Sequence, residues 1–198
     1  MNKKHINITS SSNSNIRIIG GLWRSRKLKI ISNTKLRPTL NKVRETLFNW
    51  LTSIFFFQKV DCLDCYAGSG ALAIETLSRF AAKATLLEIN RSVVIQLQKN
   101  LFLLATNNRA TVIQTNTINW LSTFKNQFNL VFIDPPFHHM LINRTINLLE
   151  ENGWLTDNAW IYIESHINNK ILRTPSHWEL YRENITGQVY YCLYHRTR

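Results

Sequence analysis

The sequence predicts an α/β protein with a mostly parallel sheet that helices cover on both faces. From residue 60 onward, short apolar segments alternate with longer segments of helical periodicity, which is the pattern of strands and helices wound into a parallel sheet. The segment 130–133 is apolar throughout, as expected of a strand buried on both faces. The segments 178–182 and 189–195 alternate tyrosines with other side chains and predict a closing antiparallel hairpin.

The N-terminal part is expected to form a small hairpin and one helix. Residues 1–15 are mostly lysine, asparagine and serine with little to bury, so we expect a disordered head. Residues 16–21 and 26–30 alternate apolar and basic side chains and predict two strands, with isoleucines on one face and cations on the other. Apolar residues then recur at helical spacing from residue 40 to 54, after a suitable N-cap at Thr39.

The elements of the α/β part follow in order from residue 60, and no internal repeat is visible. Helices are recognised by apolar residues at helical spacing, and strands by short apolar runs that end at polar or turn residues. We expect strands at residues 60–65, 84–88, 110–115, 130–134 and 159–164. Helices are expected at residues 71–79, 92–104 and 141–151, with a further short helix that follows the strand 110–115 and runs through residue 120.

The chain of 198 residues is strongly basic. Lysine and arginine number 24 against 12 acidic residues, a formal charge of +12. A small protein with this charge usually binds a polyanion, most often nucleic acid, although surplus lysines can also serve solubility alone. No stretch approaches the roughly 20 apolar residues needed to span a bilayer, and the N-terminus lacks the apolar core of a signal peptide. We therefore expect a cytoplasmic protein with no membrane segment.

The three cysteines predict no metal site. Cys62 and Cys65 have the spacing C-x-x-C, but no second pair and no nearby histidine completes a ligand set. We expect both residues, and the distant Cys192, to be buried small side chains of a protein from a reducing compartment.

The segment 130–137 delivers polar groups at the end of a buried strand. Asp134 follows the apolar run, and the prolines at 135 and 136 favour a stiff turn. In open α/β sheets ligands bind at the carboxyl ends of the strands. Asp134 and the carbonyl of Pro135 can accept hydrogen bonds from the exocyclic amine of a base, while Phe137 can stack on its face. The alternative is an ordinary proline turn after a buried strand.

A glycine loop after the first strand of the α/β part predicts a nucleoside cofactor site. The loop runs from Asp64 through Tyr66 and Ala67 to Gly68 and Gly70 and opens a helix, so its backbone can approach a ligand closely. Glu88 ends the next strand, about twenty residues on, where an acid normally binds the ribose hydroxyls.

The rest of this pattern favours S-adenosylmethionine over a nicotinamide dinucleotide. Nicotinamide enzymes use a third glycine to bring the helix near a pyrophosphate, and residue 73 is alanine. Asn116 ends the third strand and could bond the adenine amine, with Thr117 beside it. An asparagine at that place is equally often a plain helix cap.

The basic hairpin is the candidate RNA-binding surface. An aromatic residue among cations is typical of contacts to RNA backbone and bases. The candidate residues are Arg17, Trp23, Arg24, Arg26, Lys27 and Lys29, and after them Arg37 and Arg44. For Trp23 the alternative is packing on the apolar face of its own hairpin. For Arg37 and Arg44, which could reach a phosphate or the cofactor, the alternative is solvated charge.

In content and order these motifs resemble the bacterial small-subunit (16S) ribosomal RNA guanine-N2 methyltransferase family, RsmD. The segments that carry the resemblance are 16–21, 37–39, 43–48, 64–72, 77–79 and 134–137. It implies a class I S-adenosylmethionine-dependent methyltransferase, Rossmann-like, with a seven-stranded, mostly parallel sheet and an antiparallel last strand. It also implies methyl transfer to the N2 amine of one guanine of small-subunit rRNA. We expect the rRNA to be part of a ribosomal assembly intermediate and the enzyme to be a monomer.

The resemblance assigns roles to the motifs and divides the chain. Residues 1–15 would be the head, residues 16–57 an RNA-docking extension and residues 58–198 the methyltransferase domain. The glycine loop and Glu88 match the donor site, and the segment 134–137 matches the clamp on the target base. Departures from the family are Ala73 and Phe80 in place of glycine, and His138 and His139 in place of a basic pair.

Two other functions fit parts of the pattern. The clamp also suits an adenine-N6 methyltransferase acting on DNA or RNA, although such DNA enzymes usually carry a separate recognition domain. A non-catalytic RNA-binding module on a methyltransferase scaffold is the other alternative, but its glycine loop and clamp would be expected to have decayed.

Overall fold

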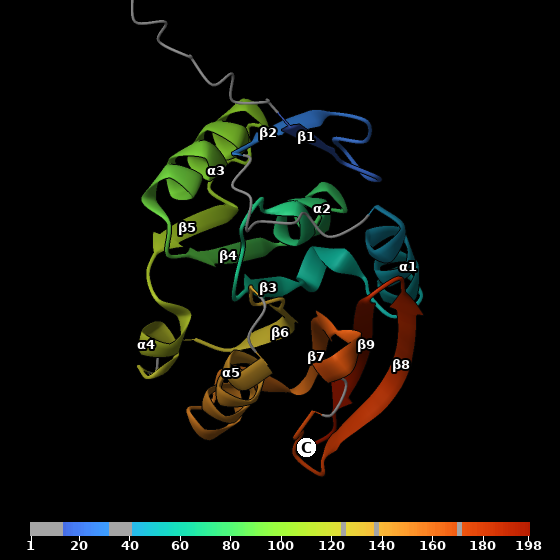
Figure 1. The fold of residues 1–198 in the computed structure, drawn as a ribbon. Helices are drawn as coiled ribbons and strands as arrows, with labels where there is room; N and C mark the ends of the chain where they lie inside the picture. The colour runs from blue at the N-terminus through green and yellow to red at the C-terminus, as the bar shows by residue number, and fades with distance from the viewer. Residues whose placement is uncertain (1–13, 32–40, 124–125, 137–138, 170–171) are drawn as a thin grey trace, which may run out of the picture.

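The computed structural model describes residues 14–31, 41–123, 126–136, 139–169 and 172–198. In this part of the chain seven strands form one sheet in the order β5-β4-β3-β6-β7-β9-β8 (Figure 1). They are β3 (Asp61–Asp64), β4 (Lys83–Glu88), β5 (Ala110–Gln114), β6 (Phe128–Ile133), β7 (Leu155–His166), β8 (Trp178–Thr186) and β9 (Val189–Arg196).

The directions of the strands confirm the predicted sheet. β5, β4, β3, β6 and β7 run parallel, whereas β9 runs antiparallel to both of its neighbours, β7 and β8. The strand order proceeds outward from β3 to β5 and then returns to the other side of β3 with β6. The carboxyl ends of β3 and β6 therefore flank the point where strand order reverses, which is where open α/β sheets bind ligands.

Helices cover both faces of the sheet (Figure 1). One side carries α1 (Asn41–Thr52), α2 (Ala71–Ser78) and α3 (Arg91–Leu103), and the other carries α4 (Thr117–Leu121) and α5 (His139–Glu151). Alternate strand residues divide between two cores, so that Leu130 and Phe132 pack in the first and Val131 and Ile133 in the second. Short 3₁₀ turns occur at Phe57–Lys59 and Ile167–Asn169.

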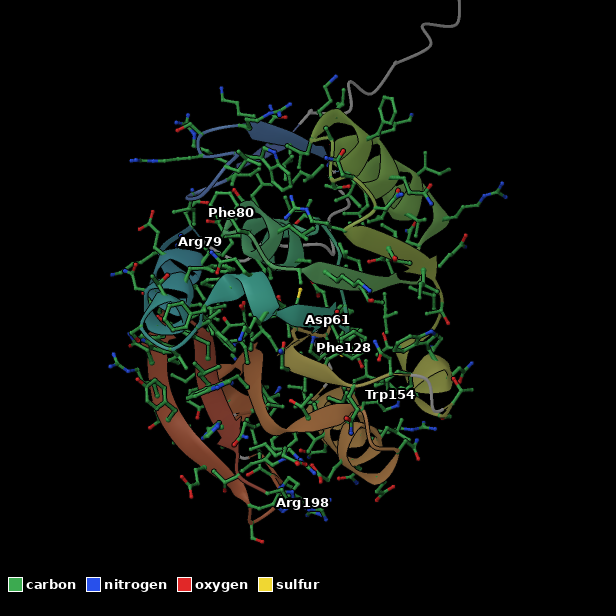
Figure 2. All side chains as sticks on the ribbon, turned by 180° about the vertical axis from the view of Figure 1, so that it is seen from behind. Asp61, Arg79, Phe80, Phe128, Trp154 and Arg198 are labelled. Carbon is green, nitrogen blue, oxygen red and sulfur yellow. The ribbon has the colours of Figure 1, made fainter. Side chains whose placement is uncertain are left out.

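Trp154 joins α4 to the second core. It is fully buried, stacks on Trp120 with ring centroids 4.4 Å apart, and lies 6.3 Å from the ring of Phe128 (Figure 2). Its indole N–H donates to the carbonyl of Leu121 at 2.9 Å. The end of α4 is thus held by one large side chain, whose polar atom is satisfied on burial.

The predicted N-terminal hairpin is present. β1 (Ser14–Arg17) pairs antiparallel with β2 (Lys27–Ile30), and Arg17 lies opposite Lys27. Its apolar side chains, Ile16, Ile18 and Leu28, are buried, whereas its cations are exposed. β1 begins inside the predicted head, because the ladder to β2 extends to Ser14; residues 1–13 lie outside the described part of the chain.

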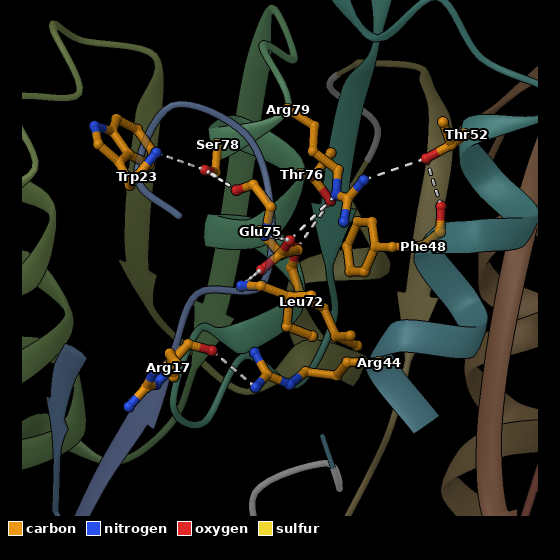
Figure 3. Close-up of polar contacts among 12 residues, drawn as sticks. Arg17, Trp23, Arg44, Phe48, Thr52, Leu72, Glu75, Thr76, Ser78 and Arg79 are labelled. Atoms are coloured by element: carbon orange, nitrogen blue, oxygen red, sulfur yellow. Dashed lines mark hydrogen bonds and ion pairs between the residues drawn. The ribbon is translucent and has the colours of Figure 1, made fainter. Parts of the chain in front are cut away.

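The hairpin packs directly on α2 through Glu75 (Figure 3). The Glu75 carboxylate is fully buried and accepts from the amides of Ile19 at 2.8 Å and Gly20 at 2.7 Å, and from Nε of Arg79 at 3.1 Å. Ser78 extends this contact, since its hydroxyl donates to the carbonyl of Gly20 at 2.6 Å.

The approach of the hairpin to α2 requires a glycine at residue 21. Gly21 has φ of 73°, and a Cβ there would lie 1.9 Å from the carbonyl oxygen of Ser78. Side chains of the hairpin, α1 and α2 also share one apolar core. The expected division at residue 57 is therefore not a boundary of packing, because residues 16–57 and the α/β part bury each other's apolar faces.

Several elements differ in extent from the expectation. β7 begins at Leu155 rather than residue 159, with a register shift against β6 between Phe128 and Leu130. β8 continues to Thr186 although its side chains are mostly exposed, because hydrogen bonds to β9 rather than burial maintain it. Asp134 lies just beyond β6.

Phe80, at one of the departures from the family, has a left-handed backbone. Its φ is 74° and its side chain is 51% exposed, next to Arg79 at the end of α2 (Figure 2). Bulky residues rarely adopt this conformation, which glycine adopts without strain. The other departure, Ala73, is fully buried in α2, where its methyl group contributes to the first core.

The predicted burial of Cys62, Cys65 and Cys192 is confirmed, and all three are free thiols. Burial raises the pKa of the Cys62 and Cys65 thiols well above the usual range. None of the helices in the described ranges is long and apolar enough to cross a membrane.

We predict that Glu75→Ala destabilises the protein by about 3–5 kcal/mol, because it leaves the Arg79 guanidinium and two backbone amides without their acceptor. Glu75→Gln should cost less, since it keeps one acceptor oxygen. Urea unfolding measures both values. Glu45→Ala, on the exposed side of α1, is the control and should remain within about 0.5 kcal/mol of the parent protein. An equally small effect of Glu75→Ala would contradict the assigned role.

Candidate active site

The parallel strands converge on a cavity of about 560 Å³ at their carboxyl ends. Carboxyl groups from four strand ends enter its wall: Asp64 at the end of β3, Glu88 at the end of β4, Asp134 after β6 and Glu164 near the end of β7. These are four of the twelve acidic residues of a basic protein. A cavity with this lining favours a ligand that carries positive charge.

The glycine loop forms one side of the cavity. Tyr66, Ala67 and Gly68 line it, and the loop is closed by a hydrogen bond from the amide of Gly70 to the carbonyl of Ala67 at 2.7 Å. Gly68 and Gly70 have φ of 50° and 74°, and a Cβ on Gly70 would lie 2.6 Å from Cδ2 of Leu97. Gly70 does not line the cavity itself, but a larger residue there would collide with Leu97, which does.

Glu88 holds the loop from the neighbouring strand. It is 9% exposed, and its Oε2 accepts from the amide of Gly68 at 3.0 Å while Oε1 accepts from the amide of Asn90 at 2.8 Å. Each carboxylate oxygen retains a further lone pair, so Glu88 can still accept hydrogen bonds from two ribose hydroxyls. The spacing of about twenty residues from the glycine loop predicted a ribose contact for Glu88, which stays a prediction, whereas its bond to the Gly68 amide was not predicted.

Asp64 lies deeper in the same wall and is 2% exposed. Its pKa is raised to about 7, mainly by burial and secondly by the negative charge of Asp134. Near neutral pH this carboxyl thus changes its charge readily. A cationic ligand would stabilise the ionised form.

Asn116 and Thr117 line the cavity at the start of α4, and both also have structural partners. Asn116 is the N-cap of α4 and accepts from the amide of Asn119 at 3.2 Å. The Thr117 hydroxyl donates to the carbonyl of Cys65. The predicted helix cap at Asn116 is therefore present, and an adenine contact would use the remaining capacity of its amide group.

The turn after β6 forms another side of the cavity. Asp134 is partly exposed, Pro135 is buried, and both line the cavity together with Pro136. Phe137 and His138 lie outside the described residues, and the side chain of His139 is likewise not described.

Glu164 was not among the predicted site residues. It lies in the cavity wall near Asp134, is 9% exposed, and accepts a hydrogen bond from the Tyr162 hydroxyl at Oε2, 2.9 Å away. Burial and then the charge of Asp134 raise its pKa to about 9. The sequence contained a signal for Glu164, because the predicted strand 159–164 ends in a carboxylate, just as the predicted strand 130–134 ends in Asp134.

The hairpin also contributes to the cavity, which the sequence did not predict. Lys29, Ile30 and Ile31 line its rim. The carbonyl of Lys29 accepts a hydrogen bond from the Asn100 side chain of α3 at 2.9 Å. The same strand thus presents cations outward and closes part of the cofactor pocket.

The hairpin cations that were predicted to bind RNA are exposed, but two other predicted contacts are wrong because the side chains are buried. Arg17, Arg24, Arg26, Lys27 and Lys29 are exposed, although the Arg26 guanidinium also donates to the carbonyl of Leu103 at 2.9 Å. Trp23 is only 4% exposed and belongs to the first core. This agrees with the alternative that Trp23 packs on the apolar face of the hairpin. Arg37 lies outside the described residues.

Arg44 is the second wrong contact, because its side chain is 1% exposed. It donates to the carbonyl of Arg17 at 2.9 Å and to Oδ1 of Asn41 at 2.6 Å (Figure 3). Arg44 therefore joins α1 to the hairpin and reaches neither RNA nor the cavity.

Within the described ranges, no group of three or more His, Cys, Asp or Glu side chains could hold a metal ion. The residues that line the cavity do fit the cofactor that the sequence predicts. Its volume suits a nucleoside-sized ligand. The acidic wall of the cavity, the position of Glu88 for a ribose and the glycine loop match a positively charged adenosine derivative without phosphates.

Residues 16–195 match a family model described as Conserved hypothetical protein 95. A relative from Escherichia coli strain K12, named Ribosomal RNA small subunit methyltransferase D, is 51% identical over 94% of this chain and 92% of its own. The solved structure of yhhF from Escherichia coli is 49% identical, with a TM-score of 0.85, and the match covers 93% of this chain and 99% of that one.

A more distant likeness shows the shared fold alone. The structure of an RNA methyltransferase from Salinibacter ruber in complex with S-adenosyl-L-homocysteine is 13% identical, with a TM-score of 0.64. The match covers 82% of this chain and 95% of that one.

We predict that S-adenosylmethionine binds more tightly as pH rises from 6 to 7.5, because Asp64 ionises over this range and the ligand carries a net positive charge. The expected gain is about fivefold to tenfold in affinity, measured by calorimetry. Asp64→Asn should bind more weakly and with little pH dependence. Asp157→Asn, at an exposed carboxyl, is the matched control and should retain the slope of the parent protein. A flat profile in the parent protein would contradict the prediction.

Proposed function

The chain belongs to the family of the bacterial small-subunit ribosomal RNA methyltransferases D, and we propose that it transfers a methyl group from S-adenosylmethionine to the N2 amine of one guanine in small-subunit rRNA. The observation that carries this proposal is the Asp134-Pro135-Pro136 turn, which lies in the wall of the cavity that also contains the glycine loop and Glu88. Donor and acceptor sites are thereby adjacent.

Residues on the glycine-loop side would hold the donor. Glu88 accepts hydrogen bonds from the ribose hydroxyls, and the loop from Tyr66 to Gly68 lies against the ligand. Asp64 provides negative charge for a cationic ligand, and Asn116 with Thr117 bounds the adenine end. The bound donor supplies an electrophilic methyl group on a sulfonium.

Residues after β6 would hold the acceptor. The Asp134 carboxylate and the Pro135 carbonyl accept the two protons of the amine, and Phe137 stacks on the base. A nucleobase amine is a weak nucleophile because its lone pair is shared with the ring. Two acceptors on its protons favour the pyramidal geometry in which the lone pair can attack, and Asp134 can take the proton that the alkylated nitrogen loses.

The exposed cations of the hairpin would dock the RNA next to the cavity. Arg17 and Lys27 lie opposite each other on the outward face, and Arg24 lies in the connecting turn. The substrate that we propose is an assembly intermediate, in which the shape of the RNA would select one guanine. We also propose that the enzyme acts as a monomer in the cytoplasm.

The proposed function is tested by incubating the purified protein with labelled S-adenosylmethionine and unmodified small-subunit particles. Nucleoside analysis of the product should show N2-methylguanosine. N6-methyladenosine instead would favour the adenine-directed alternative, and donor binding without any transfer would favour a non-catalytic RNA-binding module.

Asp134→Ala is predicted to lower turnover by at least about a hundredfold, because the amine is no longer held in the attacking geometry. Donor affinity should stay within about threefold of the parent protein, since the ribose and the glycine loop are not changed. Methyl transfer and calorimetry measure the two effects. Turnover equal to that of the parent protein would remove Asp134 from the proposed clamp.

Replacing Arg17 and Lys27 by glutamine should flatten the salt dependence of RNA binding by about 1.4 in logarithmic slope, the value for two contacts to single-stranded phosphates. Donor affinity should remain unchanged, because neither side chain lines the cavity. The matched control replaces Lys59 and Lys83 by glutamine. These two exposed cations lie before β3 and at the start of β4, at the amino ends of the strands and so away from the cavity. Equal slopes for the two double variants would exclude hairpin docking.

A further inference from the structure

Glu164 stands next to Asp134 because of the register between β6 and β7. Ile133 and Ile163 are partners in this parallel pair, so the residues that follow them are neighbours at the carboxyl edge of the sheet. Both carboxyl groups line the cavity, and adjacent strands lie about 4.8 Å apart. The turn proposed to bind the target amine therefore has a second carboxyl group beside it.

The surroundings of Glu164 keep its carboxyl neutral at pH 7. The group is 9% exposed, and burial followed by the charge of Asp134 raises its pKa to about 9. The fully buried Tyr162 donates its hydroxyl proton to Oε2 at 2.9 Å. The proton of the neutral acid therefore belongs on Oε1, which makes Glu164 a hydrogen-bond donor. Buried carboxylic acids are known to act as donors in this way.

Other titratable groups surround this pair. The same cavity is lined by Asp64 at the end of β3, Glu88 at the end of β4, Lys29 of β2 and His166 of β7. On the neighbouring strand β9, Tyr191 is the register partner of Glu164. Among the charged groups, Asp134 is the one that raises the pKa of Glu164, whereas the hydrogen bond from Tyr162 lowers this pKa without offsetting burial.

We propose that Glu164 is a specificity-determining residue that donates a hydrogen bond from its carboxyl O–H to N3 of the target guanine, while Asp134 accepts from the adjacent N2 amine. This inference rests on the proposed function. It follows from matching donors to acceptors: the amine offers protons to the charged Asp134, and the ring nitrogen next to it offers a lone pair to the neutral Glu164. Two charged carboxylates would instead repel that lone pair.

The first test compares Glu164→Ala and Glu164→Gln in methyl transfer to small-subunit particles. Glu164→Ala should lower kcat/KM for the acceptor by about tenfold to a hundredfold, as expected for one lost hydrogen bond to a buried partner. Glu164→Gln keeps an N–H donor and should restore most of this loss. Glu179→Gln, on the exposed edge strand β8, is the matched control and should leave transfer unchanged.

The pH profile adds a readout that a merely structural role would not change. In the parent enzyme, transfer should fall as pH rises through about 9, because ionised Glu164 cannot donate. Glu164→Gln cannot ionise and should lack this decline. A decline of the same size in both proteins would overturn the inference, and so would transfer in Glu164→Ala equal to that of the parent enzyme.

The decisive substrate is RNA that carries 3-deazaguanine at the mapped target position, since it keeps the amine but has no ring nitrogen at position 3. The substitution should lower kcat/KM about tenfold or more for the parent enzyme and have little further effect on Glu164→Ala. Equal penalties in the two proteins would overturn the contact. The proposed function fails in a different way, when the parent enzyme produces no N2-methylguanosine from unmodified particles.

Discussion

The buried carboxylate of Glu75 determines where the N-terminal hairpin lies relative to the cofactor loop. It is carried by α2, the helix that begins directly after Gly70, and it accepts the amides of Ile19 and Gly20. Removed from water, this charge is stable only while its donors are in place. Since Lys29 and Ile30 of β2 and the following Ile31 line the cavity, the complete pocket depends on the contact between Glu75 and the hairpin.

The distribution of charge separates the two substrates of the proposed reaction. The chain has a formal charge of +12, yet four carboxyl groups meet in its cavity. The outward face of the hairpin can attract a polyanion, whereas the cavity attracts a small cation. The phosphates of the RNA and the cationic donor are thereby directed to adjacent places, and the neutral target base can enter the cavity between them.

The carboxyl groups of the cavity are brought together by topology rather than by sequence proximity. β3, β4, β6 and β7 are parallel, so each ends at the same edge of the sheet. Their terminal acids come from segments up to a hundred residues apart, from Asp64 to Glu164. Crowding is the physical consequence: Asp134 raises the pKa of both Asp64 and Glu164, and the cluster thereby acquires groups whose charge depends on the ligand.

The sequence by itself determined the elements of the fold and the two motifs of the site. Apolar periodicity identified the buried strands, and the glycine loop, Glu88 and the clamp after residue 133 were recognisable because each is a local signal. Only the tertiary structure decided that Trp23 and Arg44 are buried, that Lys29 borders the cofactor cavity and that Glu164 adjoins Asp134. Each of these depends on which distant segment covers a side chain. Periodicity shows which face of an element is apolar, but the partner of that face is chosen by strand register and by contacts such as those of Glu75, between residues more than fifty positions apart.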